Sequence, residues 1–121
     1  MSAMSNYLEL KVLDHILSTT AYTMPTGIYL ALATGSFGED ASGTELSGSA
    51  YARQGDVAFA AASGGTTSNS ANIEFPAATG SWGSVAYWAL FDASSSGNML
   101  IHGAFSAAKT IATGDILRVN A

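Results

Sequence analysis

Few side chains in this sequence could do acid–base or metal chemistry. The chain has two histidines, His15 and His102, and no cysteine, which removes thiolate nucleophiles, disulfides and cysteine-ligated zinc. Neither histidine stands at a spacing typical of metal ligands. His15 falls on the polar side of an expected helix, so we interpret it as a surface residue. His102 shares a predicted strand face with Leu100 and Ala104, and we predict a hydrogen-bonded structural role for it.

Three acidic residues, Glu39, Asp40 and Glu45, lie in one loop rich in Gly and Ser. Carboxylates suit calcium, but this spacing matches no EF-hand or nonapeptide motif, so we expect a solvated loop without a metal. No G-x-S-x-G elbow is present, and no Gly-Lys-Ser/Thr follows the Gly64-Gly65 pair. The sequence therefore favours a protein that is not an enzyme and holds no cofactor.

Aromatic side chains and one arginine are the remaining candidates for recognition. Trp82 lies in a bend between Gly80 and Gly83, where we expect it to be exposed. The planar donors of Arg53 suit a carboxylate, either within the chain or on another subunit. A sugar-stacking platform, core packing and a subunit interface are the alternative uses of the aromatic rings. We take Tyr22, Arg53 and Trp82 as candidate interface residues.

The composition limits the possible partners. The chain has 121 residues, which predicts one domain over residues 1–121. Lys and Arg number 4 against 9 Asp and Glu, so the sequence predicts no nucleic-acid partner. The longest stretch free of polar residues is 85–91, far below the roughly 20 residues of a membrane span, and the start lacks a basic leader. We expect a soluble protein made in a cytoplasm, with no membrane partner.

The low charge content is the most unusual property of the composition. Charged residues make up 11% of the chain, against roughly 25% in an ordinary domain. Small polar side chains must therefore cover much of the surface, and such a surface loses little side-chain entropy when a neighbour covers it. The composition favours a component of an assembly, with self-association into a homo-oligomer.

One helix is expected, over residues 5–18. Ser5 or Asn6 can cap it, and Asn6 with Glu9 has the spacing of a capping box. At about 100° per residue, the apolar side chains cover an arc of roughly half the circumference. We expect this arc to contact the protein's own sheet and a partner chain.

Strands are expected in the rest of the chain, at residues 26–33, 51–61, 70–75, 84–92, 99–106, 109–111 and 116–119, with Gly- and Ser-rich turns between them. The segment 84–92 is apolar on both faces, which predicts a central strand. The pattern predicts a mainly β protein, an antiparallel β-sandwich or jelly roll with the N-terminal α-helix packed beside it.

Short motifs in a fixed order resemble those of a family of small virion proteins of tailed bacteriophages. The order is Ser5-Asn6-Tyr7-Leu8-Glu9, Leu13-Asp14-His15, Ala21-Tyr22-Thr23, Ile28-Tyr29-Leu30-Ala31-Leu32, Tyr51-Ala52-Arg53-Gln54, Thr67-Ser68-Asn69-Ser70-Ala71, Phe75-Pro76, Trp82-Gly83, Leu90-Phe91-Asp92, His102-Gly103, Lys109-Thr110 and Gly114-Asp115. The resemblance covers essentially the whole chain. Relatives tend to continue into another strand beyond Val119, so we expect a final strand to be missing or supplied by a neighbour.

The resemblance implies a phage structural protein with a β-sandwich or jelly-roll core. Members carry a tail-fibre label, and similar small sandwiches serve as decoration proteins on phage heads. Because this sequence has no repeat, coiled coil or β-helix to supply fibre length, we favour capsid decoration. Its partner would be the major capsid protein, its location the capsid surface of the virion, and its action the stabilisation of the shell by binding. The alternative is a small tail or tail-fibre component involved in host attachment.

Overall fold

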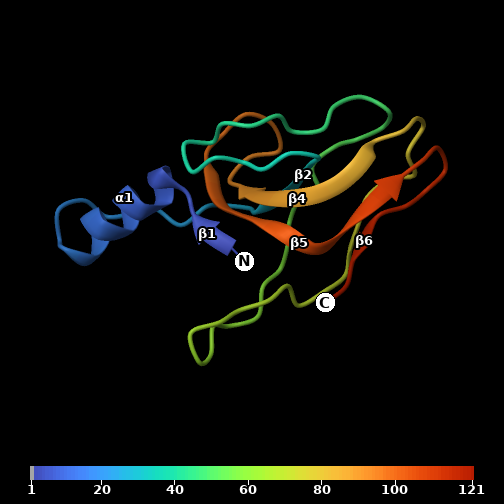
Figure 1. Ribbon diagram of the computed structural model, residues 1–121. Coiled ribbons are helices and arrows are strands. Elements are labelled where there is room, and N and C mark those ends of the chain that lie inside the picture. Colours follow the sequence, from blue (N-terminus) through green and yellow to red (C-terminus); the bar gives the residue numbers. More distant parts are fainter. Residues whose placement is uncertain (1) are drawn as a thin grey trace.

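The computed structural model describes residues 2–121 and shows a mainly β protein with antiparallel sheets and one helix near the N-terminus (Figure 1). The predicted fold class is confirmed. The elements are β1 (Ser2–Met4), α1 (Asn6–Ile16), β2 (Tyr29–Ala33), β3 (Ile73–Glu74), β4 (Gly83–Phe91), β5 (Met99–Ile111) and β6 (Arg118–Val119).

The larger sheet has four strands in the order β1-β5-β4-β2. As the apolar pattern predicts, β4 is central: Leu90 pairs with Leu30 of β2 on one side and with Ile101 of β5 on the other. Strand β1, which the sequence analysis did not predict, pairs Ala3 with His102 at the edge of β5. The Gly- and Ser-rich turn predicted after residue 91 joins β4 to β5 as a hairpin.

A second, two-stranded sheet of β3 and β6 covers one face of the larger sheet. The main core lies between these layers. Its largest fully buried side chains are Phe75, Leu32 and Val85, and Trp82 is packed among them. On the opposite face a smaller core of Ala and Phe side chains forms where the loop after β2 places Phe37 over β4. The result is a two-layer sandwich with sheets of unequal size.

Helix α1 begins where the sequence predicts. Ser5 is the N-cap, and its hydroxyl accepts a hydrogen bond from the Leu8 N–H at 3.1 Å. Asn6 is the first helical residue, so the Asn6–Glu9 capping box does not form. The expected contact of the apolar arc with the sheet is made only in part, since Leu8 and Val12 are half-buried whereas Leu10, Leu13, Ile16 and Leu17 are exposed. No residue of α1 is buried, because only the start of the helix is fixed to β5 and the rest lies to one side of the sheets (Figure 1).

The strand boundaries differ from the prediction at four places. Strand β2 begins at Tyr29 instead of residue 26. Residues 51–61 form no strand and make only isolated bridges, at Gln54 to Leu30 and at Phe59 to Asn69. The expected strands 70–75 and 116–119 shrink to two residues each. The segments 99–106 and 109–111 form one continuous strand, β5. Between its pairings with Tyr87 and Val85, β5 has three more residues than β4, and the strand continues through this irregularity.

Candidate interaction surface

Arg53 pairs with a carboxylate of its own chain. Its guanidinium Nε donates to both carboxylate oxygens of Glu45, at 2.9 and 3.1 Å, and its Nη2 donates to Oε2 at 2.7 Å. The Arg53 side chain is only 7% exposed. Charge-assisted bidentate pairs are strong and directional, and their strength rises away from water. The pair therefore fixes the loop that carries Glu45 against the segment that carries Arg53.

Tyr51 completes the coordination of the same carboxylate. Its hydroxyl donates to Glu45 Oε1 at 2.6 Å and accepts from the Leu32 N–H at 3.0 Å. Burial, together with the hydrogen bond to Glu45, raises the pKa of Tyr51 far above its usual value. The hydroxyl therefore stays protonated and remains a donor at every physiological pH. The ring also stacks on Phe75, which ties this polar cluster to the main core.

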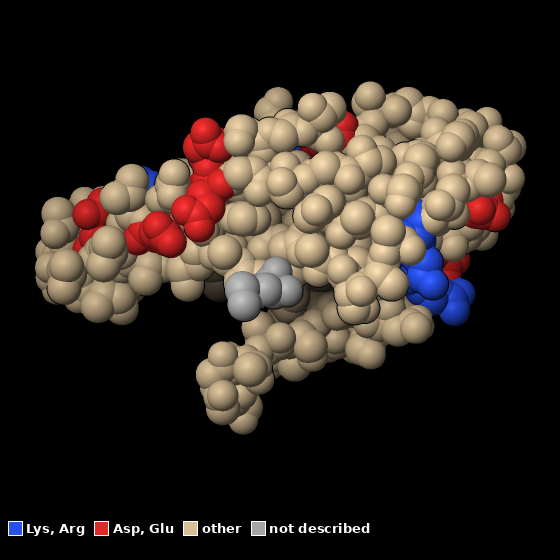
Figure 2. Space-filling model, viewed as in Figure 1, with Lys and Arg blue, Asp and Glu red and all other residues tan. Residues whose placement is uncertain are grey.

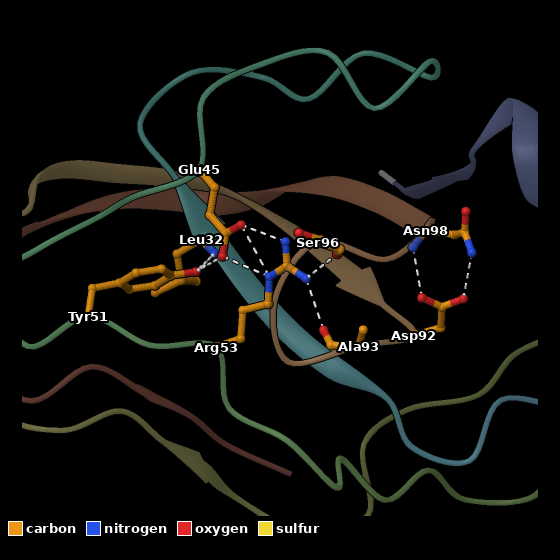
Figure 3. Close-up of polar contacts among 8 residues, drawn as sticks. All are labelled: Leu32, Glu45, Tyr51, Arg53, Asp92, Ala93, Ser96 and Asn98. Carbon is orange, nitrogen blue, oxygen red and sulfur yellow. Dashed lines mark hydrogen bonds and ion pairs between the residues drawn. The ribbon is translucent and has the colours of Figure 1, made fainter.

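The other side of the guanidinium holds the turn between β4 and β5 (Figure 3). Arg53 Nη1 donates to the carbonyl oxygens of Ala93 at 2.9 Å and Ser96 at 2.8 Å. The guanidinium carbon lies 3.7 Å from the centre of the Phe91 ring, a cation–π contact. One side chain thus connects the end of β4, the Glu45 loop and the β4–β5 turn.

The turn itself is closed at its base. Asp92 Oδ1 accepts from the Asn98 N–H at 2.7 Å, and Oδ2 accepts from the Asn98 side-chain amide at 2.9 Å (Figure 3). Gly97 has φ +72°, and a Cβ at this position would lie 2.6 Å from Asp92 Oδ1. The exposed tip at residues 94–96 is therefore presented in one conformation. The donors of Arg53 and Tyr51 are already engaged within the chain, so these side chains stabilise the fold. The ordered turn beside them suits recognition or assembly.

The three predicted interface residues have different environments. Arg53 acts within the chain, which was one of the two alternatives for it. Trp82 is only 5% exposed, so its expected exposure is wrong. The bend at Gly83 turns the indole inward, where it packs edge-on against Tyr51 and donates to the Ser49 carbonyl at 3.0 Å.

Tyr22 is half-buried in the segment that returns from α1 to β2. Its backbone N–H donates to His15 Nδ1 at 3.1 Å. Burial raises the pKa of Tyr22, and the nearby Tyr7 and Asp92 raise it further. Tyr22 and Arg53 therefore both lie near the β4–β5 turn, whereas Trp82 lies in the core and is not part of the same surface.

The two histidines and Asp40 lie in different environments. His15 is exposed, as predicted. His102 Nε2 is buried with no hydrogen-bond partner in the described part of the chain, so the prediction of a hydrogen-bonded role is wrong for that nitrogen. Hydrogen bonds from the Ser42 side chain and from the Ser42 N–H hold the pKa of Asp40 below its usual value. Within residues 2–121, no group of three His, Asp or Glu side chains could hold a metal ion.

Acidic side chains gather near the start of α1, whereas the far end of the molecule carries Lys and Arg side chains with acidic groups beside them (Figure 2). The Asn6 N–H donates to the Glu39 carbonyl at 2.9 Å, so the exposed carboxylates of Glu39 and Asp40 lie near Glu9 at the start of α1. At the far end, the exposed Lys109 of β5 and Arg118 of β6 line one shared hollow. Sequence reasoning missed this polarity, because these residues are brought together only by the fold.

One family model accounts for nearly the whole chain. The family described as podophage GP4 fiber I protein gp80 matches residues 3–121. The chain belongs to this family. No curated relative matches it.

Membership in the gp80 family makes this chain a structural protein of a phage virion, as the motif order implied. The family description names a fibre, which agrees with the tail-fibre label expected from the resemblance. Within residues 2–121 of this gp80-family chain, no helix has the length and apolar character required to cross a lipid bilayer.

Proposed function

We propose that this protein is a repeating subunit of a phage tail fibre, with a structural role and no catalysis. The match of residues 3–121 to a family described as a fibre protein carries the proposal. The chain itself is a small sandwich with an 11-residue helix, and neither element is fibrous. In this proposal, several copies joined to one another or to a linking protein supply the length of the fibre.

The surface supports a role in assembly. Charged residues make up only 11% of the chain, so few charges need to be desolvated when a neighbour covers the surface. Large apolar side chains remain exposed on α1, an arrangement that marks interaction sites in folded proteins. The β4–β5 turn is already ordered by contacts within the chain. A partner that binds it therefore loses little affinity to the conformational entropy of ordering the turn.

Capsid decoration is the competing proposal. The low charge favours it as well, and a sandwich of this size fits the junction between capsid subunits. Its partner would be the major capsid protein, and its location the head surface. The two proposals differ in where the protein sits and in how many copies a particle carries.

The number of copies per particle distinguishes the tail-fibre proposal from the capsid-decoration proposal. We expect quantitative mass spectrometry of purified particles to find far fewer copies of this protein than of the major capsid protein, and gold-labelled antibodies to bind at the tail. Copies equal to the capsid subunit, or a simple fraction of it, with labelling over the head would instead establish decoration. Removal of the protein should leave the temperature at which filled heads burst unchanged if it belongs to the tail.

A further inference from the structure

The apolar side chains of α1 face solvent. Leu10, Leu13, Ile16 and Leu17 are 63%, 55%, 69% and 70% exposed. At about 100° per residue they lie on one side of the helix, in a stripe that also includes Glu9. Single exposed apolar residues are ordinary, but a contiguous stripe marks an interaction surface. Residues 2–121 of the same chain do not bury this stripe, so we expect a partner to cover it.

The attachment of α1 to β5 keeps the apolar stripe away from the sheets of the same chain. The Ser5 hydroxyl, only 1% exposed, donates to the Met99 carbonyl, and the Ser5 N–H donates to the Leu100 carbonyl at 2.8 Å. Beyond this anchor α1 extends away from the sheets (Figure 1). Its half-buried residues are Tyr7, Leu8, Lys11, Val12 and Asp14, and most of them lie on the side away from the stripe.

A complementary groove opens between the two sheets. It consists of two adjoining hollows of about 270 and 320 Å³, which share Phe105 and Val119. The lining is apolar and includes Leu30, Val57, Phe59, Trp88, Phe105 and Val119. Figure 2 shows a hollow between the body and the arm formed by residues 58–70. Lys109 and Arg118 line the second hollow; Arg118 is already paired with Glu74, so Lys109 supplies the positive charge at this end of the groove.

We propose that the apolar stripe of α1 from one copy docks in this groove of a second copy. Leu10, Leu13 and Leu17 are spaced at i, i+3 and i+7, which is the pattern of a helix that binds an apolar groove. The charges are complementary, because the stripe carries Glu9 and the groove carries Lys109. The inference rests on the proposed function, in which copies of this chain build a fibre, and it names the surfaces that join them.

A symmetric contact between two α1 helices is less favourable. In a parallel arrangement it would bring the acidic ends of two copies together, with Glu9, Glu39 and Asp40 near their counterparts, and in an antiparallel arrangement Glu9 would have no basic partner from the groove. It would also leave the groove open to water. Docking into the groove covers both apolar surfaces in one contact and pairs unlike charges.

The test compares variants of the full chain by sedimentation and light scattering. Leu13→Asp places a charge in the stripe, and Ala107→Glu places one at the exposed lining of the groove. Ala77→Asp, at an exposed residue that lines neither surface, is the matched control. We expect the wild type and the control to associate, and each of the other variants to weaken the dissociation constant by about 100-fold. All substituted side chains are exposed, so circular dichroism should show native folding.

Mixing the two weakened variants separates the possible contacts. One copy in the mixture retains an intact groove and the other an intact helix, so we expect the mixture to associate when neither variant does alone. Loss of association in Leu13→Asp but not in Ala107→Glu would overturn the inference in favour of a symmetric helix contact. A wild type that stays monomeric at millimolar concentration would overturn it as well. Copy number and labelling on particles test the fibre role independently of these outcomes.

Discussion

Glu45 shows how a single side chain depends on its neighbours. Its carboxylate accepts hydrogen bonds from Arg53 and from Tyr51, which also accepts the Leu32 N–H. If the carboxylate loses its charge, the Arg53 guanidinium remains 7% exposed and without its counter-ion. Breaking a buried pair from one side is costly because it leaves the other charge in a medium of low dielectric constant.

Glu45→Gln should lower the free energy of unfolding by about 3 kcal/mol, since the substitution keeps the shape of the side chain and removes its charge. Chemical denaturation measures the change. Glu74→Gln is the matched control, because Glu74 also pairs with an arginine, Arg118, but with side chains 47% and 55% exposed. An exposed pair contributes about 0–1 kcal/mol, so the control should be nearly neutral. Equal effects from the two substitutions would contradict a stabilising role for burial at Arg53.

The sequence predicts part of this cluster. The geometry of a guanidinium favours a carboxylate partner, but nothing local indicates that Arg53 selects Glu45 over Glu39 or Asp40. That choice depends on the loop after β2, which returns along the sheet and pairs Glu45 with Ala33. The expected exposure of Trp82 is wrong for a related reason. Its Gly-flanked bend was predicted, but the direction of the indole depends on the Tyr51 ring, 31 residues away in sequence.

Among the elements, α1 is attached to the sheet mainly at its N-terminal end. Ser5 satisfies two orphan groups at once: its hydroxyl caps the Leu8 N–H and donates to the Met99 carbonyl. The helix also lacks buried residues of its own, so packing adds little to its stability. The cap and the connection to β5 should therefore decide whether the helix stays formed.

Ser5→Ala should destabilise α1 more than the sheets. The substitution removes an N-cap worth about 1 kcal/mol and leaves the Met99 carbonyl without its donor. Amide hydrogen exchange should become at least about 10-fold faster in residues 6–16, with little change in β4. Asn6→Ala, at the exposed first position of the helix, should leave exchange nearly unchanged. Unaltered protection of α1 in Ser5→Ala would show that other contacts hold the helix.

Sequence periodicity predicts where helices and strands form better than it predicts what they pack against. The 3.6-residue pattern gives α1 almost to its ends, and the two-sided apolar segment gives β4. The same helical pattern misleads about contacts, because an apolar stripe indicates that something covers it and not what does. Residues 51–61 alternate like a strand, yet they make only isolated bridges, since the neighbouring positions along β2 are shared with the Glu45 loop.

Over the whole molecule, the acidic start of α1 and the basic end of the groove lie apart (Figure 2). A contact that joins unlike surfaces of two identical copies is heterologous, so it propagates into a ring or a chain unless it closes between two copies. Such a contact suits a subunit that must build length from a short chain. It also makes association depend on salt, because the charges at both ends are exposed.

Charge reversal tests this polarity. Glu9→Lys and Lys109→Glu should each weaken association by about 10-fold, and the double variant should recover most of the loss, because the pair is restored with its signs exchanged. Lys109 is chosen over Arg118, since Arg118 already pairs with Glu74 at 2.6 Å within the chain. Raising ionic strength from about 0.05 to 0.5 M should weaken association of the wild type and strengthen association of either single variant, because salt screens the attraction in the first and the like-charge repulsion in the others. If both single variants associate like the wild type at every salt concentration, the docking would be purely apolar and the charged ends would serve only solubility.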